Sequence, residues 1–268
     1  MEKWYPGHIT EAKRELIDNL KMCDTVIEVV DARSPFASKN RELDKFIKGK
    51  NRILIINKSD LIEEKISINL EKNFKKKYRY VAAISAKSGK NMKRLLYILE
   101  AMFRKKKEKL QRRGVNAFPI RVVVLGVPNV GKSQIINKLI GRKVAGVANK
   151  PGFTRGKQWV RILPNVDLLD TPGILWTNSS ENELKKMALI GSLKDSFHNT
   201  MGAAIHLIEI ISKRGIEKAY QVVLTKEEPE SVIEELTNIW KKSEEDVYKK
   251  LITDFRKGKL GLISLESA

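Results

Sequence analysis

A lysine and a serine at the end of a glycine-rich stretch are the residues of this chain with the clearest chemistry. They close the sequence Gly126-Val127-Pro128-Asn129-Val130-Gly131-Lys132-Ser133. In a loop of this pattern the glycines let backbone N–H groups turn inward around a phosphate, and the lysine reaches the β- and γ-phosphates. The serine hydroxyl binds Mg²⁺. The residues expected to bind the nucleotide here are Pro128, Asn129, Val130, Gly131, Lys132 and Ser133, and Lys132 is also a candidate catalytic residue.

The segments on either side of this loop must hold it in place. Residues 121–125 form an apolar run typical of a buried parallel strand. Residues 134–140 have helical spacing and stop at Gly141. A strand, a glycine-rich loop and a helix in this order favour a phosphate-binding loop over the alternative, a glycine-rich turn that binds nothing.

The rest of the chain divides into an alternating part and a helical part. Alternation of strands and helices predicts an α/β fold with a mostly parallel sheet, which binds ligands at the carboxyl ends of its strands. We expect a nucleotide-binding domain over residues 1–179 and a small all-helical domain over residues 180–268. Strands are expected at 25–30, 52–56, 80–84, 121–125, 158–162 and 166–169. Helices are expected at about 10–20, 40–48, 92–103, 184–191, 200–213, 230–240 and 244–256.

Two strand ends carry residues that distinguish guanine from adenine. The first bears Asn57-Lys58-Ser59-Asp60, and the second bears Ser85-Ala86-Lys87. The Asp60 carboxylate can accept hydrogen bonds from the ring N–H and the exocyclic amine of guanine, a donor pair that adenine lacks. We expect Lys58 to pack its stem along the base, Asn57 to brace the loop, and the Ala86 N–H to contact the guanine carbonyl. The residues expected to contact GTP here are Asn57, Lys58, Asp60, Ser85, Ala86 and Lys87.

A further strand end supplies the remaining part of the site. It bears Asp170-Thr171-Pro172-Gly173. We expect Asp170 to hold Mg²⁺ through water and the Gly173 N–H to contact the γ-phosphate. Thr154 is the candidate for a second hydroxyl on Mg²⁺, beside Ser133.

These parts are the GTPase motifs in a permuted order. In ordinary small GTPases the phosphate loop comes first and the guanine-reading motifs last, whereas here the guanine-reading motifs come first. A parallel sheet tolerates such circular permutation, because close termini can be joined and the chain reopened at another surface loop. The loop at Asp170–Gly173 then leads directly into the helical region, so loss of the γ-phosphate could reposition that region.

The composition bounds the partners of the chain. Its 268 residues carry a formal net charge of +20, which is typical of a protein that binds a polyanion, either a nucleic acid or an acidic membrane surface. The alternative is a lysine-rich surface that serves solubility or heat tolerance, and we favour RNA or DNA. The one cysteine, Cys23, excludes an intrachain disulfide and suits a reducing compartment. We see no signal peptide and no apolar run that approaches the ~20 residues of a membrane span. A cytoplasmic location without membrane contact is therefore expected.

Taken together, these motifs resemble the circularly permuted GTPases of ribosome assembly, in particular the YlqF/RbgA-like and YawG-like group. The resemblance includes Trp4-Tyr5-Pro6-Gly7-His8, Asp31-Ala32-Arg33-Ser34-Pro35, the permuted GTPase motifs and Gly191-Ser192-Leu193-Lys194-Asp195. It implies a GTP-dependent factor that binds ribosomal RNA while the large ribosomal subunit, or its precursor, matures.

The chain lacks the glutamine that orients the attacking water in ordinary GTPases, so another residue must take this role. Ordinary GTPases often place a glutamine after Asp-x-x-Gly, but here the position is Ile174, which cannot orient water. The resemblance points to His8 as the catalytic residue, with a surface histidine beside a turn as the alternative. Asn129 resembles the asparagine of GTPases that bind K⁺ beside the phosphates, where a cation replaces an arginine finger. The alternative is that Asn129 only caps its loop.

Three functions remain open at this point. The first is an RNA-activated GTPase, slow on its own, that acts as a monomeric assembly switch on the large ribosomal subunit. The second is a GTPase directed at another RNA such as tRNA, and the third is a basic RNA-binding scaffold that holds GTP without turnover. Basic clusters in the helical domain favour it as the RNA contact, with solvated helix faces that also carry acidic clusters as the alternative. The run at residues 104–114 is either a solvated linker or helix end or a further RNA contact.

Overall fold

A six-stranded sheet forms the centre of the computed structural model, which describes residues 14, 16–41, 43–47, 49–116, 118–141, 159–169, 179–193 and 200–266. The strand order is β3-β2-β1-β4-β6-β5. All neighbouring pairs are parallel except β5 and β6, which form an antiparallel edge hairpin. The predicted mostly parallel sheet is confirmed. The strands are β1 (Thr25–Asp31), β2 (Asn51–Asn57), β3 (Tyr80–Ala83), β4 (Ile120–Leu125), β5 (Trp159–Leu163) and β6 (Val166–Leu169).

The central strands are buried because the sheet is covered on both faces. Every residue of β1 is buried, and so are residues 53–57 of β2. Such continuous apolar, β-branched sequence is typical of parallel strands that meet helices on both sides. The elements that cover or join the strands are α2 (Leu43–Phe46), η1 (Ser59–Leu61), α3 (Glu64–Lys75), α4 (Met92–Gln111) and α5 (Lys132–Ile140).

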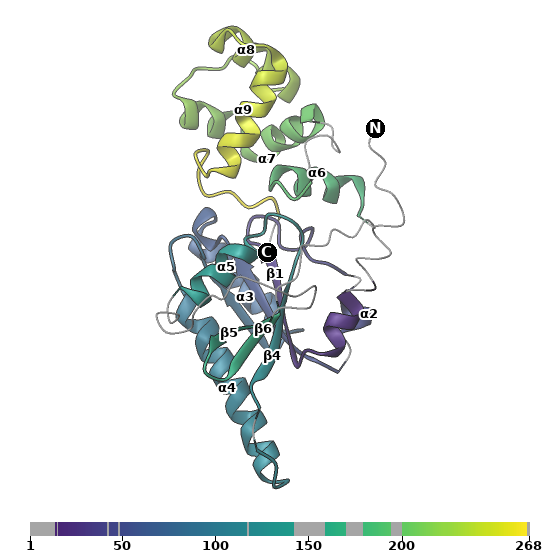
Figure 1. Ribbon diagram of the computed structural model, residues 1–268. Helices are drawn as coiled ribbons and strands as arrows, with labels where there is room; N and C mark the ends of the chain where they lie inside the picture. Colours follow the sequence, from purple (N-terminus) through teal and green to yellow (C-terminus); the bar gives the residue numbers. More distant parts are fainter. Residues whose placement is uncertain are drawn as a thin grey trace.

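The remaining helices gather beyond the carboxyl end of the sheet, as the green-to-yellow part of Figure 1 shows. The first of them starts at a capping box, in which the Ser180 hydroxyl accepts from the Glu183 N–H and the Glu183 carboxylate accepts from the Ser180 N–H. This arrangement gives the helix a sharp N-terminus. The helices are α6 (Glu181–Leu189), α7 (Thr200–Tyr220), α8 (Pro229–Trp240) and α9 (Glu244–Arg256).

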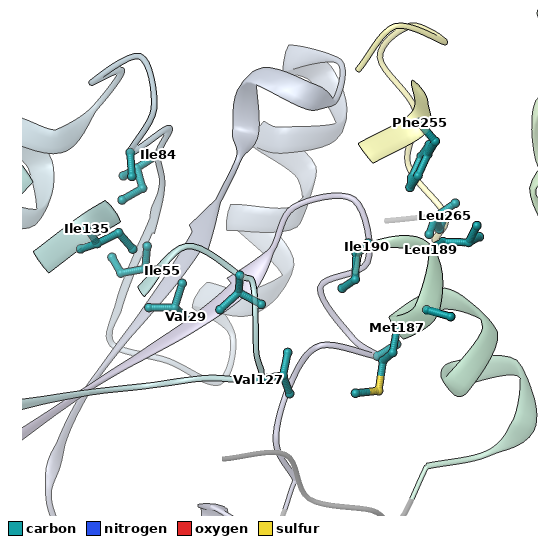
Figure 2. Close-up of a cluster of buried hydrophobic side chains, with 14 of the residues drawn as sticks. Val29, Ile55, Ile84, Val127, Ile135, Met187, Leu189, Ile190, Phe255 and Leu265 are labelled. Atoms are coloured by element: carbon teal, nitrogen blue, oxygen red, sulfur yellow. The ribbon is translucent and has the colours of Figure 1, made fainter. Parts of the chain in front are cut away.

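One hydrophobic cluster joins the sheet to this helical region (Figure 2). Val29 and Ile55 of the sheet belong to it, and so do Leu189 at the end of α6 and Phe255 of α9. Each side chain of this size that is fully buried stabilises the fold by about 1.5–3 kcal/mol. The helical region is therefore packed against the sheet through apolar contacts.

Several helices differ in length from the expectation. The basic run after Phe103 continues α4 to Gln111 instead of forming a linker. The predicted helix at 40–48 is reduced to α2, and residues 16–21 are the continuous described helical part of the predicted helix at 10–20. Helix α7 extends to Tyr220, but Ser212 has φ 65° and ψ 163° and interrupts its helical backbone. No helix in the described part of the chain is long and apolar enough to cross a membrane.

Candidate nucleotide-binding site

The phosphate loop lies between β4 and α5, as the sequence predicts. Gly126 faces the neighbouring strand so closely that an added Cβ would collide with the Val29 carbonyl oxygen. Gly131 has φ 96°, and an added Cβ there would collide with the Asn57 side-chain amide. Glycine is thus required at both ends of the loop, by close approach at Gly126 and by both close approach and backbone conformation at Gly131. Val130 between them is fully buried.

Lys132 begins α5 and folds back over the loop. Its Nζ donates to the carbonyl oxygens of Gly126, at 2.9 Å, and Val127, at 2.7 Å. Burial lowers the pKa of the Lys132 amine to about 8. Ser133, the next residue, lies in the first turn of α5 and is exposed. The two side chains at the helix N-terminus are therefore placed where an anion is favoured by the helix dipole and backbone N–H groups.

Asn57 connects the guanine-reading loops to the phosphate loop. The Asn57 side chain is buried at the end of β2, and its Nδ2 donates to the Val130 carbonyl oxygen at 2.8 Å. Its Oδ1 accepts from the Ala86 N–H at 3.0 Å. One amide thus holds together three loops that are far apart in the sequence, which is the bracing role expected of Asn57. The Ala86 N–H, expected to contact the guanine carbonyl, is engaged by Asn57 in this structure.

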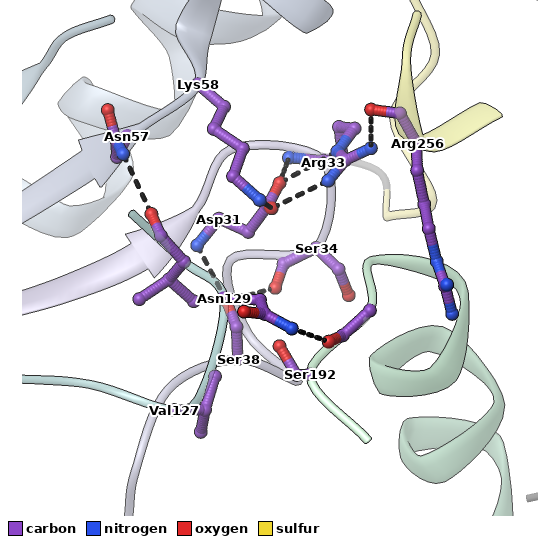
Figure 3. A network of polar contacts seen from close by, with 12 residues as sticks. Asp31, Arg33, Ser34, Ser38, Asn57, Lys58, Val127, Asn129, Ser192 and Arg256 are labelled. Atoms are coloured by element: carbon purple, nitrogen blue, oxygen red, sulfur yellow. Dashed lines mark hydrogen bonds and ion pairs between the residues drawn. The ribbon is translucent and has the colours of Figure 1, made fainter. Parts of the chain in front are cut away.

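Lys58 is held by a buried carboxylate from the end of β1. It has φ 62°, and its Nζ lies 2.7 Å from Oδ2 of Asp31. Arg33 contacts the same carboxylate with two donors, Nε at 2.9 Å from Oδ1 and Nη2 at 2.8 Å from Oδ2. Burial alone would raise the pKa of Asp31, but the charges of Arg33 and Lys58 outweigh it and lower that pKa to about 2. Asp31 therefore stays ionised and fixes the Lys58 side chain beside the site (Figure 3).

Asp60 carries a buried oxygen that no described group satisfies. Its Oδ1 has no hydrogen-bond partner, and the neighbouring Ser59 Oγ shares this condition. Native structures rarely leave a buried carboxylate oxygen without a donor, because the loss of hydration is costly. An N–H donor from a bound guanine would satisfy Asp60, so the residue expected to read guanine fits that ligand.

The second guanine-reading loop is ordered by its own backbone. The Ser85 N–H donates to the Lys90 carbonyl at 3.0 Å, and the Ser85 Oγ accepts from the Ser88 N–H at 3.1 Å. The Ser59 N–H donates to the Ile84 carbonyl oxygen at 3.0 Å, which ties the first loop to the second. Lys87 is exposed beside them.

The phosphate loop also contacts the helical region directly (Figure 3). Asn129 has φ 60°, and its Nδ2 donates to the Gly191 carbonyl oxygen at 2.6 Å. The Ser192 hydroxyl donates to the Pro128 carbonyl oxygen at 2.8 Å. Gly191 and Ser192 follow α6, so the turn after α6 and the phosphate loop hold each other at the carboxyl end of the sheet.

A second link between the two regions was not foreseen from the sequence. Arg33 points an Nη1 toward the carbonyl oxygens of Phe255 and Arg256, each at 3.4 Å, and its guanidinium lies over the Phe255 ring. Arg256 in turn donates to the carbonyl oxygens of Leu189, at 3.2 Å, and Ala188, at 2.8 Å. The Asp31-Ala32-Arg33 sequence at a strand end was the available signal, but it does not reveal these distant partners.

The chain after α9 returns to the guanine-reading side. The Ile263 N–H donates to the Leu61 carbonyl oxygen at 3.1 Å, and the Leu265 N–H donates to the Arg33 carbonyl oxygen at 2.7 Å. The Glu266 carboxylate accepts from the Phe36 N–H at 2.7 Å and the Ala37 N–H at 3.1 Å. We call residues 257–266 the C-terminal tail. It lies against the loop after β1 and the 3₁₀ turn that contains Asp60.

Four predicted site residues lie outside the described part of the chain: His8, Thr154, Asp170 and Gly173. Ser133 is thus the one predicted Mg²⁺ ligand whose position is described, and an exposed hydroxyl at the start of α5 suits that ion. Within the described ranges no three His, Cys, Asp or Glu side chains form a metal-binding group.

Fold and site define the class of the protein. The mostly parallel sheet carries a phosphate loop at the end of β4 and two guanine-type loops at the ends of β2 and β3. Because those two loops come first in the sequence, this is a circularly permuted nucleotide-binding domain. Residues 121–249 match the family model described as 50S ribosome-binding GTPase. That match begins in β4, just before the phosphate loop.

Named relatives extend this match over the whole chain. The chain is 31% identical to ribosome biogenesis GTPase A of Bacillus cereus, over 99% of this chain and 93% of that protein. It is 41% identical to ribosome biogenesis GTPase A of Thermotoga maritima, over 71% of this chain and 66% of that protein. The crystal structure of GNP-bound YlqF from T. maritima superimposes with a TM-score of 0.68 at 28% identity, covering 96% of this chain and 98% of that one.

The chain belongs to the ribosome biogenesis GTPase A (YlqF/RbgA) family. The resemblance found in the sequence motifs is thereby confirmed. The protein is a GTPase that hydrolyses GTP, and GTPases of this kind typically use Mg²⁺.

Proposed function

We propose that this GTPase is a molecular switch that binds ribosomal RNA and assists assembly of the large ribosomal subunit. The observation that carries the proposal is the direct hydrogen bonding between the phosphate loop and the helical region, Asn129 to Gly191 and Ser192 to Pro128. A site that touches the helical region at its phosphate end can transmit the presence of the γ-phosphate to whatever that region binds. The names of the relatives, ribosome biogenesis GTPase A, support the ribosome as the target.

The division of labour within the chain is part of the proposal. Residues 1–179 form the GTP-binding domain, and residues 180–268 form the helical domain that contacts RNA. The basic pairs Lys185-Lys186, Lys241-Lys242 and Lys249-Lys250 support an anionic partner, although the lysines of the first and third pairs also pair with nearby carboxylates. Binding through phosphate contacts predicts an affinity for RNA that falls steeply with salt.

The proposed contacts to GTP use described residues for the base and the phosphate loop, whereas Thr154, Asp170 and Gly173 lie outside the described part of the chain. Asp60 reads guanine with the carboxylate that holds an unpartnered buried oxygen, and Lys58 packs along the base from its fixed position beside Asp31. The Ser85, Ala86 and Lys87 loop completes the base pocket, while Lys132 binds the phosphates. Mg²⁺ is held by Ser133 and Asp170, with Thr154 as a further ligand, and Gly173 contacts the γ-phosphate.

His8 is the proposed residue that activates the attacking water. Its support is the aliphatic Ile174 where ordinary GTPases often place glutamine, together with the family resemblance of the N-terminal segment. The His8→Ala variant is expected to lower kcat strongly and leave GTP affinity nearly intact. Unchanged hydrolysis on ribosomal particles would remove the assignment.

A potassium ion beside the phosphates is the second mechanistic part of the proposal. The Asn129 Nδ2 donates to Gly191, which leaves its Oδ1 as the atom to ligate K⁺. The bound cation would stabilise the charge that develops on the transferred phosphoryl group. Hydrolysis rates in K⁺ and Na⁺ at equal ionic strength test it, and equal rates would contradict it.

Steady-state hydrolysis with added particles tests the proposed function. We expect large ribosomal subunits or their precursors to stimulate turnover, with tRNA and small subunits as controls. Stimulation by tRNA instead would indicate a tRNA-directed factor, and an absence of stimulation by any RNA would indicate a scaffold. The proposal also includes a monomer that acts in the cytoplasm. Analytical ultracentrifugation would measure its oligomeric state, and cell fractionation would measure its location.

A further inference from the structure

A cleft of about 670 Å³ lies at the end of the sheet opposite the phosphate loop. Its wall includes the residues that begin parallel strands, Asn51 of β2, Tyr80 of β3 and Ile120 of β4, with Asp24 just before β1. The phosphate loop follows β4 and therefore lies at the carboxyl edge of the same sheet. The cleft is thus separated from the nucleotide site by the length of the strands.

The other wall of the cleft is the C-terminal half of α4. Figure 1 shows this part of α4 projecting away from the sheet, on the side opposite α6–α9. The cleft lining includes Lys105, Lys109 and Leu110, followed by Arg113 just past the helix end. Lys105, Lys109 and Arg113 are all exposed.

The cleft is strongly basic. Seven of its fifteen lining residues are lysine or arginine, and the one acidic side chain is Asp24. That carboxylate is already used, because it pairs with Lys106 at 2.8 Å and accepts from the Arg121 N–H at 2.8 Å. The positive charge of the cleft is therefore left largely uncompensated by its own walls.

Three of the cations form an unpaired row. Lys105 and Lys109 are one helical turn apart, and Arg113 follows after the same interval. Among the described residues, no carboxylate lies within ion-pair distance of these three side chains, and no acceptor hydrogen-bonds to them; the nearby Asp24 carboxylate pairs with Lys106 instead. Like charges at this spacing repel one another along a helix face, so the row is unfavourable unless an anion meets it. The row spans about 12 Å, over which a nucleic-acid strand carries several phosphates.

We propose that this cleft is a second RNA-binding surface, which takes the phosphate backbone of an RNA segment. RNA is favoured over an anionic membrane because a strand or helix edge can enter a concave cleft, whereas a flat bilayer cannot. The choice of RNA rests on the proposed function of the protein. With the helical domain at the opposite end, one molecule would bridge two RNA segments while GTP is bound between them.

The test removes the row and leaves the nucleotide site untouched. The variant is K105Q/K109Q/R113Q in the full chain. The matched control is K65Q/K72Q/K76Q, which removes three exposed lysines on or just after α3 for which no partner is described. Both variants change the net charge equally. Thermal melting and GTP affinity establish that each variant is folded with an intact nucleotide site.

The readout is binding to protein-free large-subunit rRNA as a function of salt, with phosphatidylglycerol vesicles in a parallel arm. We expect the cleft variant to bind rRNA about 10- to 100-fold more weakly at 0.1 M salt, with the slope of log K against log[salt] reduced by about 2 to 3. The control variant should lose much less. An equal loss in the control would mean that only total charge matters, and it would overturn the proposal.

Further results would also overturn the inference. One is rRNA binding by the cleft variant at the wild-type level. Another is a loss of vesicle binding without a loss of RNA binding, which would make the cleft a membrane surface. If the helical-domain variant K241Q/K242Q loses rRNA binding while the cleft variant does not, the inference fails and the proposed function stands. If the wild-type protein binds no RNA at all, both the inference and the proposed function fail.

Discussion

Asn57→Ala is the substitution whose cost follows most directly from the structure. The Asn57 side chain is fully buried and makes two hydrogen bonds, to the Val130 carbonyl at 2.8 Å and from the Ala86 N–H at 3.0 Å. Its removal leaves one buried acceptor and one buried donor unsatisfied. Each such group costs about 1–3 kcal/mol, so the free energy of unfolding is expected to fall by about 2–6 kcal/mol. GTP affinity should fall as well, because Asn57 aligns three loops of the site.

Chemical denaturation measures the first effect, with Asn137→Ala as the control. Asn137 is an exposed asparagine on α5, and no side-chain partner is described for it. Its replacement is expected to change stability by no more than about 0.5 kcal/mol. Equal effects of the two substitutions would refute the bracing role of Asn57.

A double-mutant cycle with Gly131→Ala isolates the contact itself. A Cβ at residue 131 would collide with the Asn57 amide, so part of the cost of Gly131→Ala should disappear once Asn57 is alanine. The remaining cost reflects the φ of 96°, which alanine adopts poorly. We expect a coupling free energy of about 0.5–3 kcal/mol, whereas strictly additive effects would contradict the geometry.

Further predictions concern three charged side chains, Lys132, Asp60 and Glu266. Because burial lowers the pKa of Lys132 to about 8, its charge is complete below that pH and is lost above it. GTP affinity should be level at lower pH and fall by up to about tenfold per pH unit above 8. Fluorescent-nucleotide titration measures this, and a slope that persists in Lys132→Arg would exclude Lys132 as its source. Asp60→Asn should weaken GTP binding about 100-fold or more and favour a xanthine nucleotide, whose carbonyl meets the new amide; competition binding with unchanged GTP preference would contradict this. Glu266→Gln weakens the carboxylate cap on the Phe36 and Ala37 N–H groups, so hydrogen exchange in the C-terminal tail should accelerate; unchanged protection would show that the cap does not hold the tail.

The sequence allowed the sheet and the loop positions to be predicted well. Continuous apolar runs such as residues 53–56 and 122–125 indicate strands buried on both faces, and both are strands in the structure. The motif at residues 126–133 depends on local backbone geometry, which glycines and their spacing determine. Asn57 was predicted to brace its loop, and its two hydrogen bonds agree with that role.

The contacts that hold the helical region could not be predicted in the same way. Arg33 reaches the carbonyl oxygens of residues 255 and 256, more than 200 positions away, and no local pattern specifies such a partner. Glu28 looks out of place in an apolar strand, but Arg52 and the Tyr78 hydroxyl meet its Oε2 at 2.6 Å and 3.2 Å. Helix α4 was predicted too short because the run after Phe103 lacks apolar periodicity, although lysine and arginine are good helix formers.

Sedimentation with ribosomal subunits shows whether the protein binds the large subunit under the control of GTP. The protein would be centrifuged with separated large and small subunits under GTP, GDP or a non-hydrolysable GTP analogue. We expect the protein to pellet with the large subunit or its precursor in a nucleotide-dependent way, most strongly with the analogue. Co-sedimentation that is the same in all nucleotide states, or that prefers the small subunit, would contradict a GTP-controlled switch on the large subunit.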